Sequence, residues 1–133
     1  MAVISGDGVF SHTCVGASDL AGSAAFYDAV LTPLGVKNLG PFGDNIILYG
    51  KDKPALLVLR PSNGEPASSA NGGTIGFAAA DKAAVDAFHA AGLANGGTCE
   101  GLPGPRGLPN SYAAYLRDPA GNKICAYHFA AGE

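Results

Sequence analysis

A few residues of this chain of 133 residues have side chains that suit chemistry. His12 lies near the start, and histidine, with an ordinary pKa of about 6.5, suits proton abstraction at neutral pH. We take His12 as the candidate catalytic residue, a general base; the alternative is a hydrogen-bonded histidine in a pocket wall. Cys125 follows the apolar Ile124. It is either a small buried apolar residue or, beside a cation such as protonated His12, a reactive thiolate.

Other polar side chains suit the binding of a ligand. Arg60 ends a predicted strand, and Arg106 lies in a Pro/Gly-rich loop just before Tyr112. These three would suit an anionic ligand, although each is equally compatible with a solvated side chain. Because side chains alternate along a strand, Tyr127 faces the same side as Cys125. His128 faces the other side.

The chain repeats itself with an offset of 62 residues. Val15 to Asp19 (VGASD) and Phe77 to Asp81 (FAAAD) each end an apolar run and precede a helix-like segment. In this alignment Thr74 is the counterpart of His12. A duplicated module predicts a pseudo-twofold domain and not a solenoid. The candidate ligand-binding residues are His12, Thr74, Cys125, Tyr127, Arg60, Arg106 and Tyr112.

The order of predicted elements is the same in both halves. Residues 10–17 form a strand, Ser18 or Asp19 caps a helix over 20–31, and Gly35 allows the chain to leave it. Turn residues then separate three short strands at 36–39, 45–50 and 55–59. In the second half a strand at 74–79 and a helix capped by Asp81 precede strands at 98–101, 111–116 and 123–129.

These elements predict an α+β fold of two tandem βαβββ modules related by a pseudo-twofold axis. Module one covers 10–60, a Pro/Ser/Asn/Gly-rich linker covers 61–73, and module two covers 74–130. The whole chain, 1–133, forms one domain. Each sheet packs its helix on one face, so two modules side by side enclose a curled mixed-sheet cleft in which a ligand can bind.

Charge and composition exclude several classes of partner. The net charge is −3 and no cluster of Lys or Arg is present, which argues against nucleic acid and anionic membranes. No apolar run approaches the roughly 20 residues of a membrane-spanning helix. Three cysteines without a CxxC pair, and no leader-like start, favour a cytoplasmic protein. We expect Cys14 and Cys99 to be buried structural residues.

Two motifs resemble those of a known family. The segment from His12 to Tyr27 and the turn Asp118 to Asn122 (DPAGN) lie at opposite ends of a chain that resembles the glyoxalase, bleomycin-resistance and extradiol-dioxygenase superfamily, the vicinal oxygen chelate fold, over nearly its whole length. The resemblance implies a ligand cleft and a homodimer. The turn itself suits a structural role, because Pro119 and Gly121 fit turn positions.

The resemblance also implies where a metal would bind. Metal-dependent members have one ligand on the first strand and one on the last strand of each module. These positions correspond here to His12, Thr74, Cys125 and Leu56 or a neighbour within 55–58. The usual carboxylates are missing, whereas a catalytic divalent ion needs about three protein ligands. We therefore predict no metal ligands and no assured cofactor, with an incomplete set for a divalent ion.

The predicted function is that of a glyoxalase/bleomycin-resistance-like protein that binds a small organic molecule in the inter-module cleft, without the full metal site. Phe42, Tyr49, Tyr112 and Tyr115 supply candidate aromatic walls. One alternative is a metal-dependent lyase, isomerase or dioxygenase of the superfamily that uses His12. Another is a purely structural domain whose cleft is filled by its own side chains. We expect His89 at a helix surface or a helix–sheet boundary.

Overall fold

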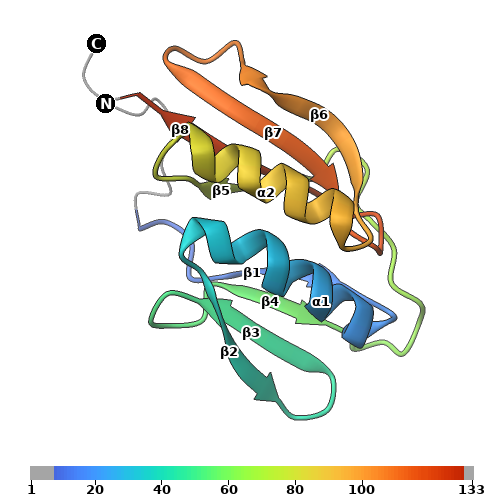
Figure 1. Ribbon diagram of the computed structural model, residues 1–133. Helices are drawn as coiled ribbons and strands as arrows, with labels where there is room; N and C mark the ends of the chain where they lie inside the picture. The colour runs from blue at the N-terminus through green and yellow to red at the C-terminus, as the bar shows by residue number, and fades with distance from the viewer. Residues whose placement is uncertain (1–7, 131–133) are drawn as a thin grey trace.

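The computed structural model describes residues 8–130, which form two four-stranded sheets, each with one helix (Figure 1). The first sheet has the order β1-β4-β3-β2 and the second β5-β8-β7-β6. The first sheet contains β1 (Thr13–Gly16), β2 (Lys37–Phe42), β3 (Ile46–Gly50) and β4 (Leu56–Leu59). The second sheet contains β5 (Ile75–Ala78), β6 (Thr98–Pro105), β7 (Ser111–Arg117) and β8 (Lys123–Phe129). The identical strand order confirms the duplicated α+β fold.

Strand direction is also the same in the two sheets. β1 runs parallel to β4, and β5 runs parallel to β8, while the remaining pairs are antiparallel. In register, Cys14 lies opposite Leu57 and Gly76 lies opposite Cys125. Since Gly76 follows Cys14 by the repeat offset, Leu57 is the structural counterpart of Cys125.

The two helices begin where the sequence predicts. α1 (Leu20–Leu31) is capped by Asp19, whose carboxylate accepts a hydrogen bond from the Gly22 backbone N at 3.1 Å. α2 (Lys82–Ala94) is capped in the same way by Asp81. Ser18, the alternative cap of α1, instead accepts a hydrogen bond from the Ala67 backbone. A short 3-10 helix, η1 (Thr32–Leu34), then leads to Gly35 at φ 76°, the predicted left-handed exit.

Several strand ends differ from the prediction. β1 is shorter than 10–17, whereas β2 and β6 continue beyond 36–39 and 98–101. Both longer strands contain proline, at Pro41 and Pro103, which the prediction treated as a turn or loop residue. β2 and β6 are the outer strands of their sheets, where a missing N–H costs no ladder hydrogen bond. Both strands also contain register shifts.

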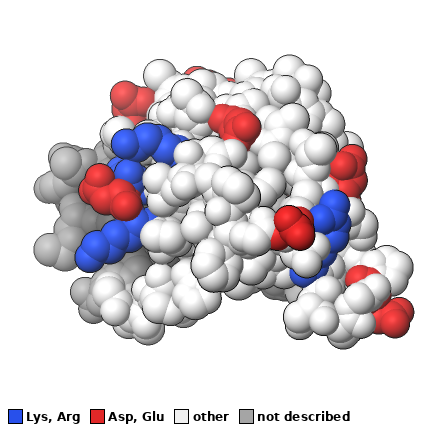
Figure 2. Space-filling model, turned by 90° about the horizontal axis from the view of Figure 1, so that it is seen from below, with Lys and Arg blue, Asp and Glu red and all other residues white. Residues whose placement is uncertain are grey.

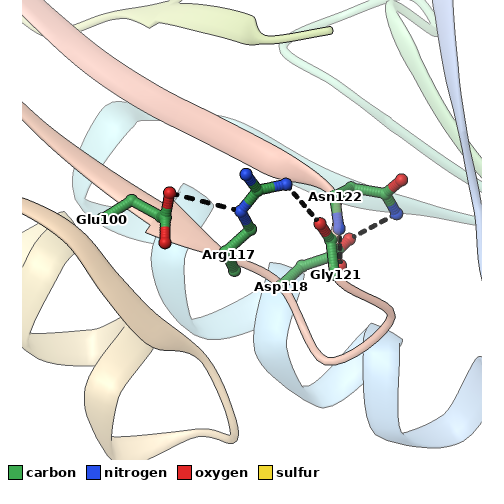
Figure 3. Close-up of polar contacts among 5 residues, drawn as sticks. All are labelled: Glu100, Arg117, Asp118, Gly121 and Asn122. Carbon is green, nitrogen blue, oxygen red and sulfur yellow. Dashed lines mark hydrogen bonds and ion pairs between the residues drawn. The ribbon is translucent and has the colours of Figure 1, made fainter. Parts of the chain in front are cut away.

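The helices lie side by side on the same side of the two sheets (Figure 1). α1 also reaches the second module, since the buried Tyr27 hydroxyl donates to Asp118 Oδ2 at 2.6 Å. Asn122 Nδ2 donates to the Gly16 carbonyl at 2.9 Å, which links the start of β8 to the end of β1. Figure 3 shows Asp118 and Asn122 in the turn between β7 and β8. The two modules are thus connected through α1 and through the turn between β7 and β8.

Two fully buried tyrosines make the fold sensitive to alkaline pH. Burial is the main cause that raises the pKa of Tyr27 and of Tyr49 above the ordinary value of 10.0, and the carboxylates that they hydrogen-bond, Asp118 and Asp28, add to it. Above about pH 10 the unfolded chain loses tyrosine protons that the folded chain keeps, so the free energy of unfolding falls as pH rises. Each such tyrosine contributes a slope of about 1.4 kcal/mol per pH unit.

Urea unfolding between about pH 8 and pH 11 measures this slope. Tyr49→Phe removes one titrating group, so its slope above about pH 10 should be smaller than that of the unsubstituted chain. Equal slopes would show that Tyr49 does not retain its proton in the fold.

No helix within residues 8–130 is long and apolar enough to cross a membrane.

Candidate functional site

The helix-free face of the second sheet carries a row of aromatic side chains. Ile124, Ala126 and Leu116 are buried in the core beneath α2, so the residues between them point away from the helix. Those residues include Cys125, Tyr127 and Tyr115. We call the following set the tyrosine face: Tyr115, Cys125, Tyr127 and Phe129, with the cations Arg106 and Lys123.

The tyrosine face is held together by close contacts. The hydroxyls of Tyr115 and Tyr127 are 2.7 Å apart and share a hydrogen bond. The rings of Tyr127 and Phe129 are stacked at 5.5 Å between centroids. Arg106 Cζ lies 5.5 Å and Lys123 Nζ 5.3 Å from the centroid of Tyr115. A small molecule on this face would meet apolar rings, hydroxyl groups and two cations.

Cys125 lies at the base of this face and opposite Tyr115 in register. Its side chain is only 3% exposed. Burial raises the pKa of its thiol to about 11, even though Lys123 and Arg106 act in the opposite direction. Cys125 is therefore a neutral thiol at neutral pH, which contradicts the reactive-thiolate interpretation and favours the apolar one.

Thr74 and His12 occupy the equivalent positions just before β5 and β1. Thr74 is exposed and lies one residue before β5, two residues from Gly76, which pairs with Cys125. His12 is exposed, and its Nδ1 lies 2.9 Å from the Oγ of Ser11. Within residues 8–130 no hydrogen bond joins His12 to the tyrosine face.

Arg60 lies on the first sheet, away from the tyrosine face. Its Nη1 donates to the Asp44 carbonyl at 3.1 Å and to Asn45 Oδ1 at 3.3 Å. It lines a cavity of about 780 Å³ with Ile46, Leu59 and Glu65. Arg60 and Arg106 thus belong to different sheets, and the structure does not bring them together.

Tyr112 was predicted to bind ligand together with Arg106, and the structure places it apart from the tyrosine face. Its hydroxyl donates to Asp86 Oδ1 of α2 at 2.7 Å, so it lies on the helix-covered face. Tyr112 and Tyr115 are an odd number of residues apart, and alternation places them on opposite faces. The Tyr49 hydroxyl donates to Asp28 Oδ1 of α1 at 2.8 Å, so Tyr49 lies away from the tyrosine face, although it lines the cavity between the two modules.

The other cysteines and histidines are also placed by the structure. Cys14 and Cys99 are exposed, so their predicted burial is wrong. Cys99 Sγ lies 3.1 Å from Nε2 of His89, which is buried at the predicted boundary between α2 and the sheet. Burial lowers the pKa of His89, so its imidazole is neutral at neutral pH. His128 lies near the Ala79 carbonyl, on the side opposite Cys125 as predicted.

The helix-free face of the first sheet is aliphatic. Leu56 and Val58 are buried under α1, so the side chains between them point away from it. We call the following set the leucine face: Cys14, Ile46, Leu48, Leu57 and Leu59. In Figure 2, seen from the side of β2 and β3, an uncharged and hollowed surface separates two groups of charged side chains.

A second cavity lies between the two modules. It has a volume of about 570 Å³ and is lined by Thr13 and Leu56 of the first module and by Ile75 and Phe77 of the second. Lys51 and Lys53 stand at its edge. β1 and β5 therefore flank a common space, as two modules placed side by side require.

A divalent metal does not fit the donor atoms that the fold brings together. Leu57, the counterpart of Cys125, has no donor atom, and Thr74 replaces a second histidine. Only His12 and Cys125 remain, and the latter is protonated at neutral pH. In the described part of the chain no three His, Cys, Asp or Glu side chains form a group suited to a metal. A catalytic divalent ion needs about three such ligands.

Lys123 was not found from the sequence as a site residue. Its signal was present, because it precedes Cys125 by two residues and so shares its face. A single lysine at the start of a strand nevertheless has the pattern of an ordinary solvated residue. Only the packing of its ammonium group on the Tyr115 ring distinguishes Lys123 from such a residue.

Residues 9–126 match the Glyoxalase/Bleomycin resistance protein/Dioxygenase superfamily, and the chain belongs to this superfamily. It is similar to a glyoxalase/bleomycin resistance protein from Albidiferax ferrireducens T118, with 49% identity and a TM-score of 0.83 over 92% of this chain and 99% of that chain. Lactoylglutathione lyase from Agrobacterium tumefaciens is 28% identical, with a TM-score of 0.61 over 90% and 92% of the two chains.

A fosfomycin resistance protein from Mesorhizobium loti, 14% identical, has the same fold with a TM-score of 0.65 over 92% of each chain. No match was found among curated proteins.

Proposed function

We propose that this protein binds a small organic molecule between the tyrosine face and the leucine face, without the full metal site of the superfamily. The observation that carries the proposal is the contrast between equivalent strands. At matching positions β8 carries Cys125 and Tyr127, whereas β4 carries Leu57 and Leu59. One wall is thus aromatic with polar groups and the other aliphatic, which is the usual composition of a small-molecule site.

His12 and Thr74 stand at the ends of the two edge strands, beside these walls. If the bound molecule is a substrate, we propose His12 as a general base that acts without a metal, since it is exposed and its imidazole can accept a proton. The metal-dependent lyase, isomerase or dioxygenase would need ligands that residues 8–130 do not supply. The purely structural alternative requires that no small molecule binds at all.

We also propose that the protein is a homodimer in which the leucine face takes part. This face combines half-buried aliphatic side chains with the strongly exposed Phe42 at the end of β2. Apolar surfaces of this kind are stabilised by association. The second copy would contact the Phe42 end of this face and leave the rest of the face to the ligand.

Binding to a panel of small organic compounds, observed by ligand NMR, tests the proposed function. We expect Tyr127→Ala to weaken binding at least about tenfold, because it removes a ring and a hydroxyl from the site. Tyr112→Ala, on the helix-covered face, is the matched control and should leave affinity within about threefold. Addition of divalent metal or of chelator should change neither of these affinities.

Loss of affinity in both tyrosine variants, or binding that requires a divalent ion, would contradict this assignment. A panel without a single binder would favour the purely structural alternative.

A further inference from the structure

Within residues 8–130, two cations of the tyrosine face lack a carboxylate partner. Arg106 and Lys123 each pack on the ring of Tyr115. Figure 3 shows an ion pair between Arg117 and Glu100, with Nε and Oε1 3.4 Å apart. Among the described residues neither Arg106 nor Lys123 forms such a pair. In a chain whose net charge is −3, this is a local excess of positive charge.

Arg106 is held in a fixed position. Its Nη1 donates to the carbonyls of Gly104 and Pro105, and its Nη2 donates to the Leu102 carbonyl at 2.6 Å. A guanidinium has five N–H donors, so the Nε–H and one Nη2–H have no partner in the described part of the chain. Two N–H donors on a fixed guanidinium suit the two oxygens of a carboxylate.

The tyrosine hydroxyls add polar groups beside these cations. Tyr115 and Tyr127 share one hydrogen bond, and the Tyr115 hydroxyl also forms a hydrogen bond with the Cys125 thiol. Burial raises the pKa of Tyr115 above its ordinary value, so the hydroxyl stays neutral. Neither Tyr115 nor Cys125 therefore supplies a negative charge that would neutralise the two cations.

The stacked rings of Tyr127 and Phe129 continue the same face beyond these polar groups. A flat, apolar body can lie against these rings while an acidic group reaches Arg106 and Lys123. On this basis, and resting on the proposed function, we propose that the ligand is a small aromatic carboxylate whose acid group is bound by the cations that pack on Tyr115, Arg106 and Lys123.

Matched pairs of ligands test this assignment. The probes are aromatic acids and their uncharged amides, such as 2-naphthoate and 2-naphthamide, titrated by isothermal calorimetry. We expect the acid to bind about tenfold more tightly than the amide, because only the acid forms charge-assisted hydrogen bonds. Raising the ionic strength from about 0.01 M to about 0.15 M should reduce the difference in affinity between acid and amide.

Variants with the same change in charge locate the acid group. Lys123→Gln should weaken acid binding about tenfold and leave amide binding unchanged. Lys82→Gln is the control, since Lys82 packs on the ring of Tyr112 at 5.4 Å, in the same geometry but on the helix-covered face. Its affinities should equal those of the unsubstituted chain.

The results of these titrations distinguish the carboxylate assignment from the proposed ligand site. Equal affinities for acid and amide, or an equal effect of Lys123→Gln and Lys82→Gln, would overturn the carboxylate assignment while the proposed ligand site stands. Tighter binding of the matched aryl phosphate than of the acid would overturn it in favour of a phosphate ester. If no acid or amide binds while other small organic compounds do, the carboxylate assignment fails and the proposed ligand site stands.

Discussion

Asp118→Ala is expected to lower the free energy of unfolding by about 3 kcal/mol or more. The Asp118 side chain is almost fully buried, and its two oxygens accept four hydrogen bonds. The donors are the Tyr27 hydroxyl, the backbone N of Ala120, and the backbone and side-chain N of Asn122. Removal of the carboxylate leaves these donors buried without partners, which costs more than the loss of an exposed bond.

Urea unfolding measures the effect, with Asp52→Ala as the control. Asp52 is an exposed aspartate in the turn between β3 and β4, the counterpart of this turn in the first module. Its replacement should change stability by less than about 0.5 kcal/mol. Similar losses in the two variants would show that the turn of Asp118 does not join α1 to the second module.

Phe26→Ala is expected to lower the free energy of unfolding by about 3 to 5 kcal/mol. Phe26 of α1 is 0% exposed and packs edge-on against Tyr27, with ring centroids 5.0 Å apart. It also fills the space beside Gly97 of the second module, where a Cβ would collide with the ring. The variant therefore opens a cavity at the junction of the modules.

Phe42→Ala is the control for this prediction, because Phe42 is 69% exposed. It should change the stability of the monomer by less than about 0.5 kcal/mol. Because a dimer interface would bury Phe42, both variants are best compared by denaturation at a protein concentration where the chain is monomeric. A small effect of Phe26→Ala would mean that the two modules unfold independently.

Most of the fold prediction depended on the internal repeat and on the residues that cap the two helices. Asp19 and Asp81 occupy the same place in the two halves and cap both helices, as the alignment predicts. Strand alternation correctly separated Cys125 from His128. These signals are local, since they depend on short-range hydrogen bonding and on the period of a strand.

For the remaining placements, one local signal was not used, and the others depended on information that local signals lack. Tyr112 was placed by its proximity to Arg106 in the chain, although alternation from Tyr115 would have placed it under α2. The ends of β2 and β6 were missed because proline is tolerated in outer strands, and strand order is not visible locally. Lys123 is recognised as a site residue only by its contact with Tyr115 on the neighbouring strand.

The duplication also explains why one chain presents two different walls. The two modules keep the same strand order, and so place equivalent residues on equivalent faces. Leu57 and Leu59 replace, in the first module, the thiol and hydroxyl of Cys125 and Tyr127. The fold can therefore be preserved while donor atoms are lost from one half, which fits a site built for organic ligands.

Native mass spectrometry of gently purified protein tests the central claim most directly, because it reports bound metal, bound small molecule and oligomeric state together. The account predicts a dimer without a stoichiometric divalent ion, and a mass excess from an organic molecule that is lost on denaturation and in Tyr127→Ala. One divalent ion per subunit that is lost in His12→Ala would contradict it.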